Sequence, residues 1–208
     1  MPADPLQPDE FRRTLLTHAR RYAVDLKQDD VARLSDYYAL LLTWNPRLHL
    51  VAPCSPAEFA TRHVLESLFL LPHLEPNGRV ADIGSGGGLP IIPVLITRPD
   101  LQGVLIESSP KKAVFLREAL RVTATSPQAV VVAERFESTP EPEVDYVTCR
   151  ALDHFAEMLP RLVQWSPVQS KLLLFGGQGL QDQIERVGLK FSAVRMPDSE
   201  ARYLYLCR

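Results

Sequence analysis

Hydrophobic residues in the first third of the chain recur with the spacing of a helix. One stripe consists of Phe11, Leu15, Ala19 and Tyr22. A second stripe with the same period consists of Val31, Leu34, Tyr38, Leu41 and Leu42. Residues spaced in this way share one face of a helix, so we expect two amphipathic helices that bury these stripes. A third helix is predicted from Ser55 to about Leu71, because Ser55, Pro56 and Glu58 have the spacing of a capping box with proline at the first helical position.

The pattern changes at Arg79 to short apolar runs, separated by segments that are long enough for helices. The runs predict strands at residues 80–83, 103–106, 129–133, 144–147 and 171–175. The other segments predict helices at residues 90–97, 109–122, 153–165 and 179–187. Strands that alternate with helices in this order are typical of a parallel sheet covered by helices on both faces.

The last two apolar runs, at residues 190–195 and 203–207, have only a turn between them. They are therefore expected to pair as an antiparallel hairpin. The predicted fold is α/β: a doubly wound, seven-stranded, mostly parallel sheet with an N-terminal helical extension and a C-terminal antiparallel hairpin. We place a boundary at the Pro76-Asn77-Gly78 turn, which gives a helical region at 1–76 packed on a sheet domain at 77–208.

Composition limits what this chain can do. With 208 residues, of which 46% are hydrophobic and 23% charged, it fits one globular unit that buries a core. No apolar run approaches the ~18–20 residues of a membrane span, and the first residues lack the features of a signal peptide, so we expect a cytoplasmic protein with no membrane partner. The three cysteines and five histidines show no metal-ligand spacing, so no metal is expected. Because the net charge is only −2, a polyanionic partner would have to meet a local basic patch.

A glycine-rich turn follows the first predicted strand and opens a helix, which is where ligands bind in open α/β sheets. Its sequence is Asp82-Ile83-Gly84-Ser85-Gly86-Gly87-Gly88-Leu89-Pro90. The dinucleotide fingerprint G-x-G-x-x-G requires a glycine where Leu89 stands, so the run fits G-x-G-x-G better. Taken alone, the glycines are explained equally well by a tight turn between strand and helix.

A second acidic position favours a nucleoside ligand. Glu107 ends the second strand about twenty residues beyond the glycines, where a carboxylate can accept hydrogen bonds from both ribose hydroxyls. Asp82 could bind the cationic end of the ligand or tie the loop amides together, and the second role is favoured. Pro90 and Pro93 remove amide donors that a pyrophosphate would need. A sulfonium nucleoside, S-adenosylmethionine, fits these features without a phosphate site.

Several short motifs occur together along the chain. They are Trp44-Asn45 followed by Leu50, Arg62-His63 followed by Ser67, the segment 82–90 with Pro93, Arg98-Pro99, Lys111-Lys112 with Phe115-Leu116-Arg117, and Arg150-Ala151. In this combination the sequence resembles the bacterial small-subunit ribosomal RNA guanine-N7 methyltransferases of the RsmG type, also called glucose-inhibited division protein B. The resemblance implies a Rossmann-like class I methyltransferase that uses S-adenosylmethionine to methylate guanine N7 in 16S rRNA of the 30S ribosomal subunit. We expect it to be a monomer.

The resemblance also implies roles for individual residues. Gly84, Gly86, Gly88 and Leu89 would wrap the methionine part of the cofactor, Glu107 would bind the ribose, and Phe136 and Glu137 would bind the adenine. Arg150 would lie near the methyl group as the catalytic residue, either orienting the guanine or pairing with a carboxylate of the cleft. Arg62, Lys111 and Lys112 would contact RNA, although the lysines fit a solvated helix face as well. Guanine N7 carries a lone pair, so the reaction requires no general base.

The chain departs from the family pattern at several positions near the expected cleft. Gly176-Gly177 stands where the family has lysine followed by glycine, and Ile91, His49, Val51 and Glu66 replace a usual glycine, asparagine, threonine and aspartate. Two alternatives therefore stay open: a methyltransferase diverged toward another RNA or a small molecule, and a non-catalytic module that binds S-adenosylmethionine or RNA. A nicotinamide oxidoreductase is disfavoured because Leu89 interrupts its fingerprint.

Overall fold

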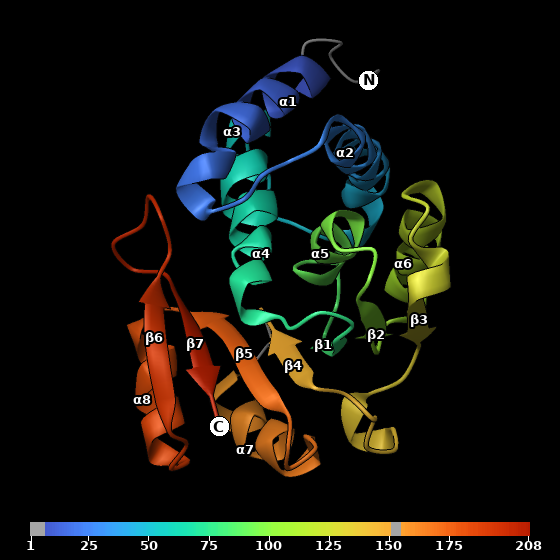
Figure 1. The fold of residues 1–208 in the computed structure, drawn as a ribbon. Coiled ribbons are helices and arrows are strands. Elements are labelled where there is room, and N and C mark those ends of the chain that lie inside the picture. The colour runs from blue at the N-terminus through green and yellow to red at the C-terminus, as the bar shows by residue number, and fades with distance from the viewer. Residues whose placement is uncertain (1–6, 151–154) are drawn as a thin grey trace.

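The computed structural model describes residues 7–150 and 155–208, and Figure 1 shows how this part of the chain folds. Its strands form one seven-stranded sheet in the order β3-β2-β1-β4-β5-β7-β6. The strands are β1 (Arg79–Ile83), β2 (Gln102–Ile106), β3 (Ala129–Val132), β4 (Tyr146–Cys149), β5 (Lys171–Gly176), β6 (Phe191–Arg195) and β7 (Tyr203–Cys207). The first five strands pair in parallel, whereas β7 runs antiparallel to both β5 and β6. The predicted mostly parallel sheet and its C-terminal hairpin are confirmed.

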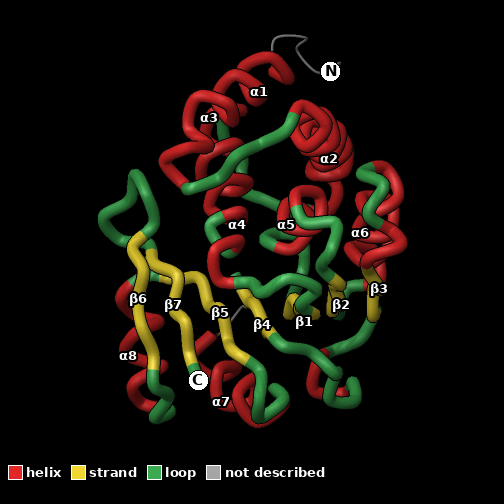
Figure 2. Tube along the Cα trace, in the orientation of Figure 1, coloured by secondary structure: helices red, strands yellow, loops and turns green. Residues whose placement is uncertain are grey.

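Helices cover both faces of the sheet, as Figures 1 and 2 show. On one face lie α5 (Ile91–Thr97) and α6 (Pro110–Val122), and on the other lie α7 (Phe155–Trp165) and α8 (Gln178–Arg186). The predicted bounds of α5, α6 and α8 agree with these within one residue, while residues 153 and 154 of the third predicted crossover helix lie outside the described residues. Two short 3-10 turns, η4 (Ser126–Gln128) and η5 (Phe136–Ser138), flank β3. None of the helices in the described ranges is both long and apolar enough to cross a membrane.

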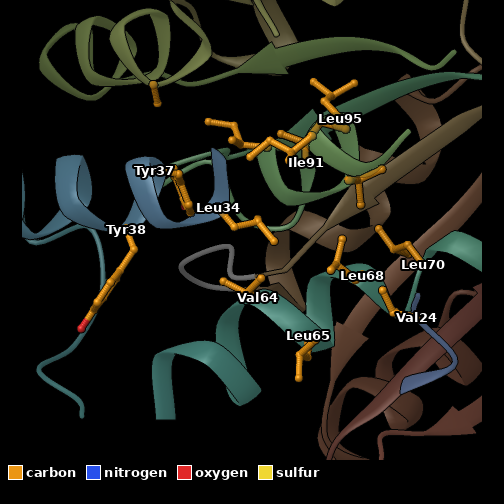
Figure 3. Packing of buried hydrophobic residues seen from close by; sticks show 14 of the residues in the cluster. Val24, Leu34, Tyr37, Tyr38, Val64, Leu65, Leu68, Leu70, Ile91 and Leu95 are labelled. Carbon is orange, nitrogen blue, oxygen red and sulfur yellow. The ribbon is translucent and has the colours of Figure 1, made fainter. Parts of the chain in front are cut away.

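The N-terminal helices pack on the α5–α6 face. They are α1 (Gln7–His18), which continues as the 3-10 turn η1 (Ala19–Tyr22), and α2 (Gln28–Leu48). The first predicted stripe is fully buried, and of the second only Leu42 is partly exposed. Figure 3 shows α2 side chains meeting those of α5 and of residues 64–70. Because these helices share one buried cluster with Val80 and Leu105 of the sheet, they form a common core; the division at residues 76 and 77 stays a prediction.

The third predicted helix is present, but it is not one continuous α-helix. It consists of α3 (Pro56–Glu58), the π-helix η2 (Phe59–Leu65) and α4 (Glu66–Leu68), and the 3-10 turn η3 (Leu71–His73) follows. The Ser55 hydroxyl accepts a hydrogen bond from the Glu58 amide at 3.1 Å, as predicted for its cap. The Glu58 carboxylate forms an ion pair with Arg62, so the structure shows only the serine half of the capping box. Hydrophobic spacing did not indicate the π-helix, whose Arg62 and His63 carbonyls accept hydrogen bonds from Arg150.

Candidate active site

A cavity of about 800 Å³ opens at the carboxyl ends of β1 and β2. Its lining includes the glycine loop from Gly84 to Gly87, the end of β2 at Ile106 and Glu107, and residues 50–52 that follow α2. Ile83 pairs with Ile106 in the sheet, so the residues that follow each strand emerge side by side. This is the place where open α/β sheets bind ligands.

The glycine loop needs backbone conformations that side chains disfavour. Gly84, Gly86 and Gly88 have φ angles of 66°, 50° and 82°. Gly88 is the most restricted of the three, because a Cβ there would lie 2.8 Å from Ile92 Cγ1 and closer still to Cδ1. Gly84, Gly86 and Leu89 line the cavity, whereas Gly88 does not. Gly88 therefore shapes the loop on the side that packs against Ile92. Its contact with a cofactor stays a prediction.

Glu107 joins the glycine loop to the start of α6. Its carboxylate is 6% exposed and accepts hydrogen bonds from two amides, that of Gly86 at 2.8 Å and that of Ser109 at 2.7 Å. A carboxylate has about four acceptor sites, so these two bonds leave capacity for a ligand in the cavity that Glu107 lines.

Asp82 has a different environment from the one predicted. Its side chain is 1% exposed, and neither carboxylate oxygen has a hydrogen-bond partner among the described residues. Burial raises the pKa of the Asp82 carboxyl well above its usual range; the nearby Ser85 hydroxyl lowers it in part, and the charge of Glu107 raises it further. The favoured role of tying the loop amides is wrong, because Glu107 reaches across from β2 and takes the Gly86 amide. The other role, at the cationic end of a ligand, stays a prediction.

Arg150 lines the cavity just after β4, and its guanidinium is held by the π-helix. Nη1 donates to the His63 carbonyl at 3.0 Å and to Ser67 Oγ at 3.1 Å, and Nη2 donates to the Arg62 carbonyl. Nη2 also lies 3.3 Å from the Glu66 carboxylate. Of the two predicted roles for Arg150, this geometry favours pairing with a carboxylate of the cleft; its catalytic role stays a prediction.

His63 belongs to the cavity wall as well. Burial lowers the pKa of its imidazole to about 4, and the positive charges of Arg150 and Arg62 contribute. The ring is therefore neutral at physiological pH and lies 5.2 Å, between centroids, from Phe59. Because the same residue gives its carbonyl to Arg150, the π-helix supplies both a neutral ring and an anchoring acceptor to the site.

The buried Glu66 carboxylate forms an ion pair with the partly exposed Arg202, and sequence reasoning missed this pair. Glu66 is 2% exposed, and its second oxygen lies 2.7 Å from Arg202, which precedes β7. Arg150 and Arg202 thus share one carboxylate, from positions 84 and 136 residues away in the chain. The one available signal was a charged residue within the apolar run of residues 64–71, which was noted only as a departure from the family pattern.

The residues predicted to bind adenine lie at another part of the cavity wall. Phe136 is 4% exposed and packs edge-on against Trp165 at 5.5 Å, so its ring forms part of the core beneath the cavity. The Glu137 carboxylate lies 3.7 Å from both Arg135 and Arg161. Both predicted residues thus border the same cavity as the glycine loop and Glu107.

Of the residues predicted to contact RNA, one lines the cavity and two are exposed outside its lining. Lys112 lines it, while Lys111 is exposed beside it in the first turn of α6. Arg62 is also exposed and pairs with Glu58. Their contacts with RNA stay predictions. In the described part of the chain, no three His, Cys, Asp or Glu side chains cluster closely enough to hold a metal ion.

Comparison with known proteins identifies the family. Residues 30–199 match the family model described as rRNA small subunit methyltransferase G. The chain belongs to this family. Ribosomal RNA small subunit methyltransferase G of Xanthomonas campestris pv. campestris (strain B100) is 46% identical over 138 residues, which span 66% of this chain and 64% of that protein. The protein of the same name from Chromobacterium violaceum is 40% identical over 138 residues, 66% of each chain. The match thus covers less than two thirds of the Xanthomonas protein, and it confirms the resemblance seen in the motifs.

Solved structures share the fold of this family member. The mitomycin 7-O-methyltransferase MmcR superimposes with a TM-score of 0.61 at 18% identity, over 95% of this chain and 67% of that chain. The ribosomal protein L11 methylase of Lactobacillus delbrueckii subsp. bulgaricus gives a TM-score of 0.58 at 12% identity, over 71% of this chain and 78% of that one. At such identities the likeness concerns the fold alone.

Two of the positions that the sequence analysis gave as departures from the family pattern lie in packed surroundings. Gly176 stands where a lysine is usual, and a Cβ there would lie 2.8 Å from Leu180 Cβ. Leu180 of α8 is buried, so the space at the end of β5 is already filled. Ile91, another departure, is fully buried beneath the loop. Ile91 is therefore a core residue, whereas at Gly176 the packing of Leu180 leaves no space for a side chain.

Proposed function

We propose that this chain is an S-adenosylmethionine-dependent methyltransferase that methylates guanine N7 in small-subunit ribosomal RNA. The observation that carries the proposal is the cavity itself: glycine backbone on one side and Glu107 on the other, in a chain of this family. We further propose that the protein acts on the 30S subunit in the bacterial cytoplasm and that it is a monomer.

The described residues fit the cofactor at three points. A cavity of about 800 Å³ is large enough for a nucleoside with a methionine tail. Glu107 keeps acceptor capacity at the end of β2, where ribose hydroxyls would lie. Gly84, Gly86 and Leu89 line the cavity beside Glu107, where the methionine tail would lie, whereas the unpartnered Asp82 carboxylate directly before the loop does not line it. Bound there, the cofactor would supply an electrophilic methyl group on a sulfonium.

The protein's own part in the reaction is placement rather than proton transfer. Guanine N7 attacks through its lone pair, so no side chain has to remove a proton. Holding two reactants in line can lower a barrier by ~7–11 kcal/mol. Arg150, tied to three carbonyl or hydroxyl oxygens and to Glu66, forms a rigid part of the wall against which the base would be placed.

Two measurements test the proposal in separate steps. Calorimetric titration with S-adenosylmethionine should show binding. Glu107→Gln should abolish this binding, because an amide NH₂ would then face one of the two backbone amides that donate to Glu107. Glu118→Gln, in α6, is the control. Transfer of labelled methyl to 30S subunits from a strain lacking the gene should then place one N7-methylguanine in 16S rRNA. Absence of binding refutes the cofactor, and binding without transfer to these subunits refutes the RNA target.

A further inference from the structure

The N-terminal helical region reaches the glycine loop through α2. The Tyr37 side chain is fully buried, and its hydroxyl donates a hydrogen bond to the Gly87 carbonyl at 2.5 Å. Leu50 and Leu41 of this region lie beside the same glycine, because a Cβ built on Gly87 would lie 3.5 Å from Leu50 and 3.7 Å from Leu41. A segment fifty residues earlier in the chain therefore sets the position of the loop.

The loop is held from two opposite sides. From the sheet, Glu107 accepts the Gly86 amide, and from α2, Tyr37 donates to the next carbonyl, that of Gly87. Both Tyr37 and Gly87 are buried, so water cannot easily replace either partner. Removing the hydroxyl would leave the carbonyl without its partner, and the loop would then populate other conformations.

We propose that Tyr37 is a positioning residue for the cofactor. Its hydrogen bond fixes the carbonyl of Gly87, and the loop residues Gly84 to Gly87 line the cavity in which the cofactor would bind. The inference rests on the proposed function, since it takes S-adenosylmethionine as the ligand of the cavity. A protein whose binding-competent loop is only partly populated binds its ligand more weakly by that fraction. Once ligand is bound the loop is in its competent form, so the loss should appear in affinity and not in the rate of methyl transfer at saturation.

Tyr38 offers a matched control one residue away on the same helix. Its ring stacks on Phe11 at 4.5 Å and on Phe59 at 4.7 Å, and in the described part of the chain its hydroxyl makes no hydrogen bond. Figure 3 shows Tyr37 and Tyr38 leaving α2 in different directions. Tyr37→Phe and Tyr38→Phe therefore remove the same atom from the same helix, with and without contact with the loop. Each variant keeps its buried ring, so both are expected to fold.

The test measures binding of S-adenosylmethionine by calorimetry, together with KM and kcat on 30S subunits. Tyr37→Phe should raise the Kd and the KM for S-adenosylmethionine about 5- to 10-fold, which is the worth of one hydrogen bond, while leaving kcat and the KM for 30S subunits within twofold of wild type. Tyr38→Phe should bind like wild type.

The inference is overturned if Tyr37→Phe binds like wild type, if Tyr38→Phe weakens binding equally, or if kcat falls while the KM for S-adenosylmethionine stays unchanged. A merely structural role would lower the melting temperature without changing the Kd. If the wild-type protein itself failed to bind S-adenosylmethionine, the proposed function would fall first, and the inference with it.

Discussion

Asp82 has a buried carboxyl group without a hydrogen-bond partner among the described residues, so its ionisation should weaken the fold. Burial raises its pKa in the native state above the value of about 3.9 in the unfolded chain. In the pH range between these two values the native state binds more protons than the unfolded state, so stability falls as pH rises through it. Asp82→Asn removes the ionisation and should raise the melting temperature at pH 8 without cofactor, with little gain near pH 4.

Asp100 provides a control of opposite sign. Its carboxylate accepts two hydrogen bonds from Arg98, at 2.6 and 2.7 Å, which hold its pKa below the usual range. A lowered pKa contributes stability above the unfolded-state value that is lost as pH falls, so Asp100→Asn should lower the melting temperature at pH 8. If both asparagine variants shifted it in the same direction, the assignment of Asp82 would be wrong.

The His63 ring should titrate well below an ordinary histidine. Its pKa is lowered to about 4 by burial and by neighbouring arginines, against about 6.5 in the unfolded chain. Between these values the unfolded state binds more protons, so the native state loses stability as pH falls from 6.5 toward 4. Proton NMR of the imidazole should give a midpoint below 5 for the resonance that disappears in His63→Gln. A midpoint near 6.5 would contradict the buried, neutral ring.

Gly88, three residues before α5, should tolerate a side chain far less than its neighbour Gly87. Alanine at Gly88 would adopt a φ of 82° and press on Ile92, whereas at Gly87 its nearest contact would be an ordinary 3.5 Å to Leu50. Left-handed strain of ~1–2 kcal/mol and overpacking of ~1–3 kcal/mol lead us to expect a loss of about 2–5 kcal/mol for Gly88→Ala. Gly87→Ala should lose less than about 1 kcal/mol. Urea unfolding measures both, and equal losses would refute the assignment of strain to Gly88.

The elements of the sheet domain could be predicted from sequence because each carries its own pattern. Apolar runs gave the strands, and the spacing between them gave the crossover helices within one residue for α5, α6 and α8. Because the carboxyl ends of parallel strands meet at one edge of a sheet, the same pattern predicted that Gly84, Gly86 and Glu107 lie close together, and the structure places them on one cavity. The π-helix could not be predicted, because hydrophobic spacing does not report a change from i+4 to i+5 hydrogen bonding.

Contacts between distant segments decide the parts of the site that sequence could not give. Tyr37 was an unremarked residue of an amphipathic helix, and its role depends on Gly87, fifty residues later. Asp82 was expected to meet the loop amides, but a competing carboxylate from the neighbouring strand took that place. In both cases the residue types fitted several partners, and only the packing of α2 on the sheet domain and the pairing of β1 with β2 selected one.

On the scale of the whole molecule, Glu66 of α4 pairs with Arg150, which follows β4, and with Arg202, which precedes β7, so its charge should matter more than that of the partly exposed Arg202. Glu66→Gln leaves two guanidinium groups without their shared carboxylate in a site that is 2% exposed, and breaking a buried pair in this way costs about 3–5 kcal/mol. Arg202→Gln leaves the Glu66 carboxylate paired with Arg150, and water already screens the charge of the 35% exposed Arg202 side chain, so we expect a loss of only about 1 kcal/mol.

Because the two residues interact directly, the double variant Glu66→Gln with Arg202→Gln should lose clearly less stability than the sum of the two single losses. In Glu66→Gln, the positive charges of Arg150 and Arg202 face each other without a carboxylate between them. Removing Arg202 from this variant removes their repulsion. Urea unfolding of the four proteins completes the cycle. Additive losses, or a Glu66→Gln loss below that of Arg202→Gln, would show that the shared carboxylate does not hold these three segments together.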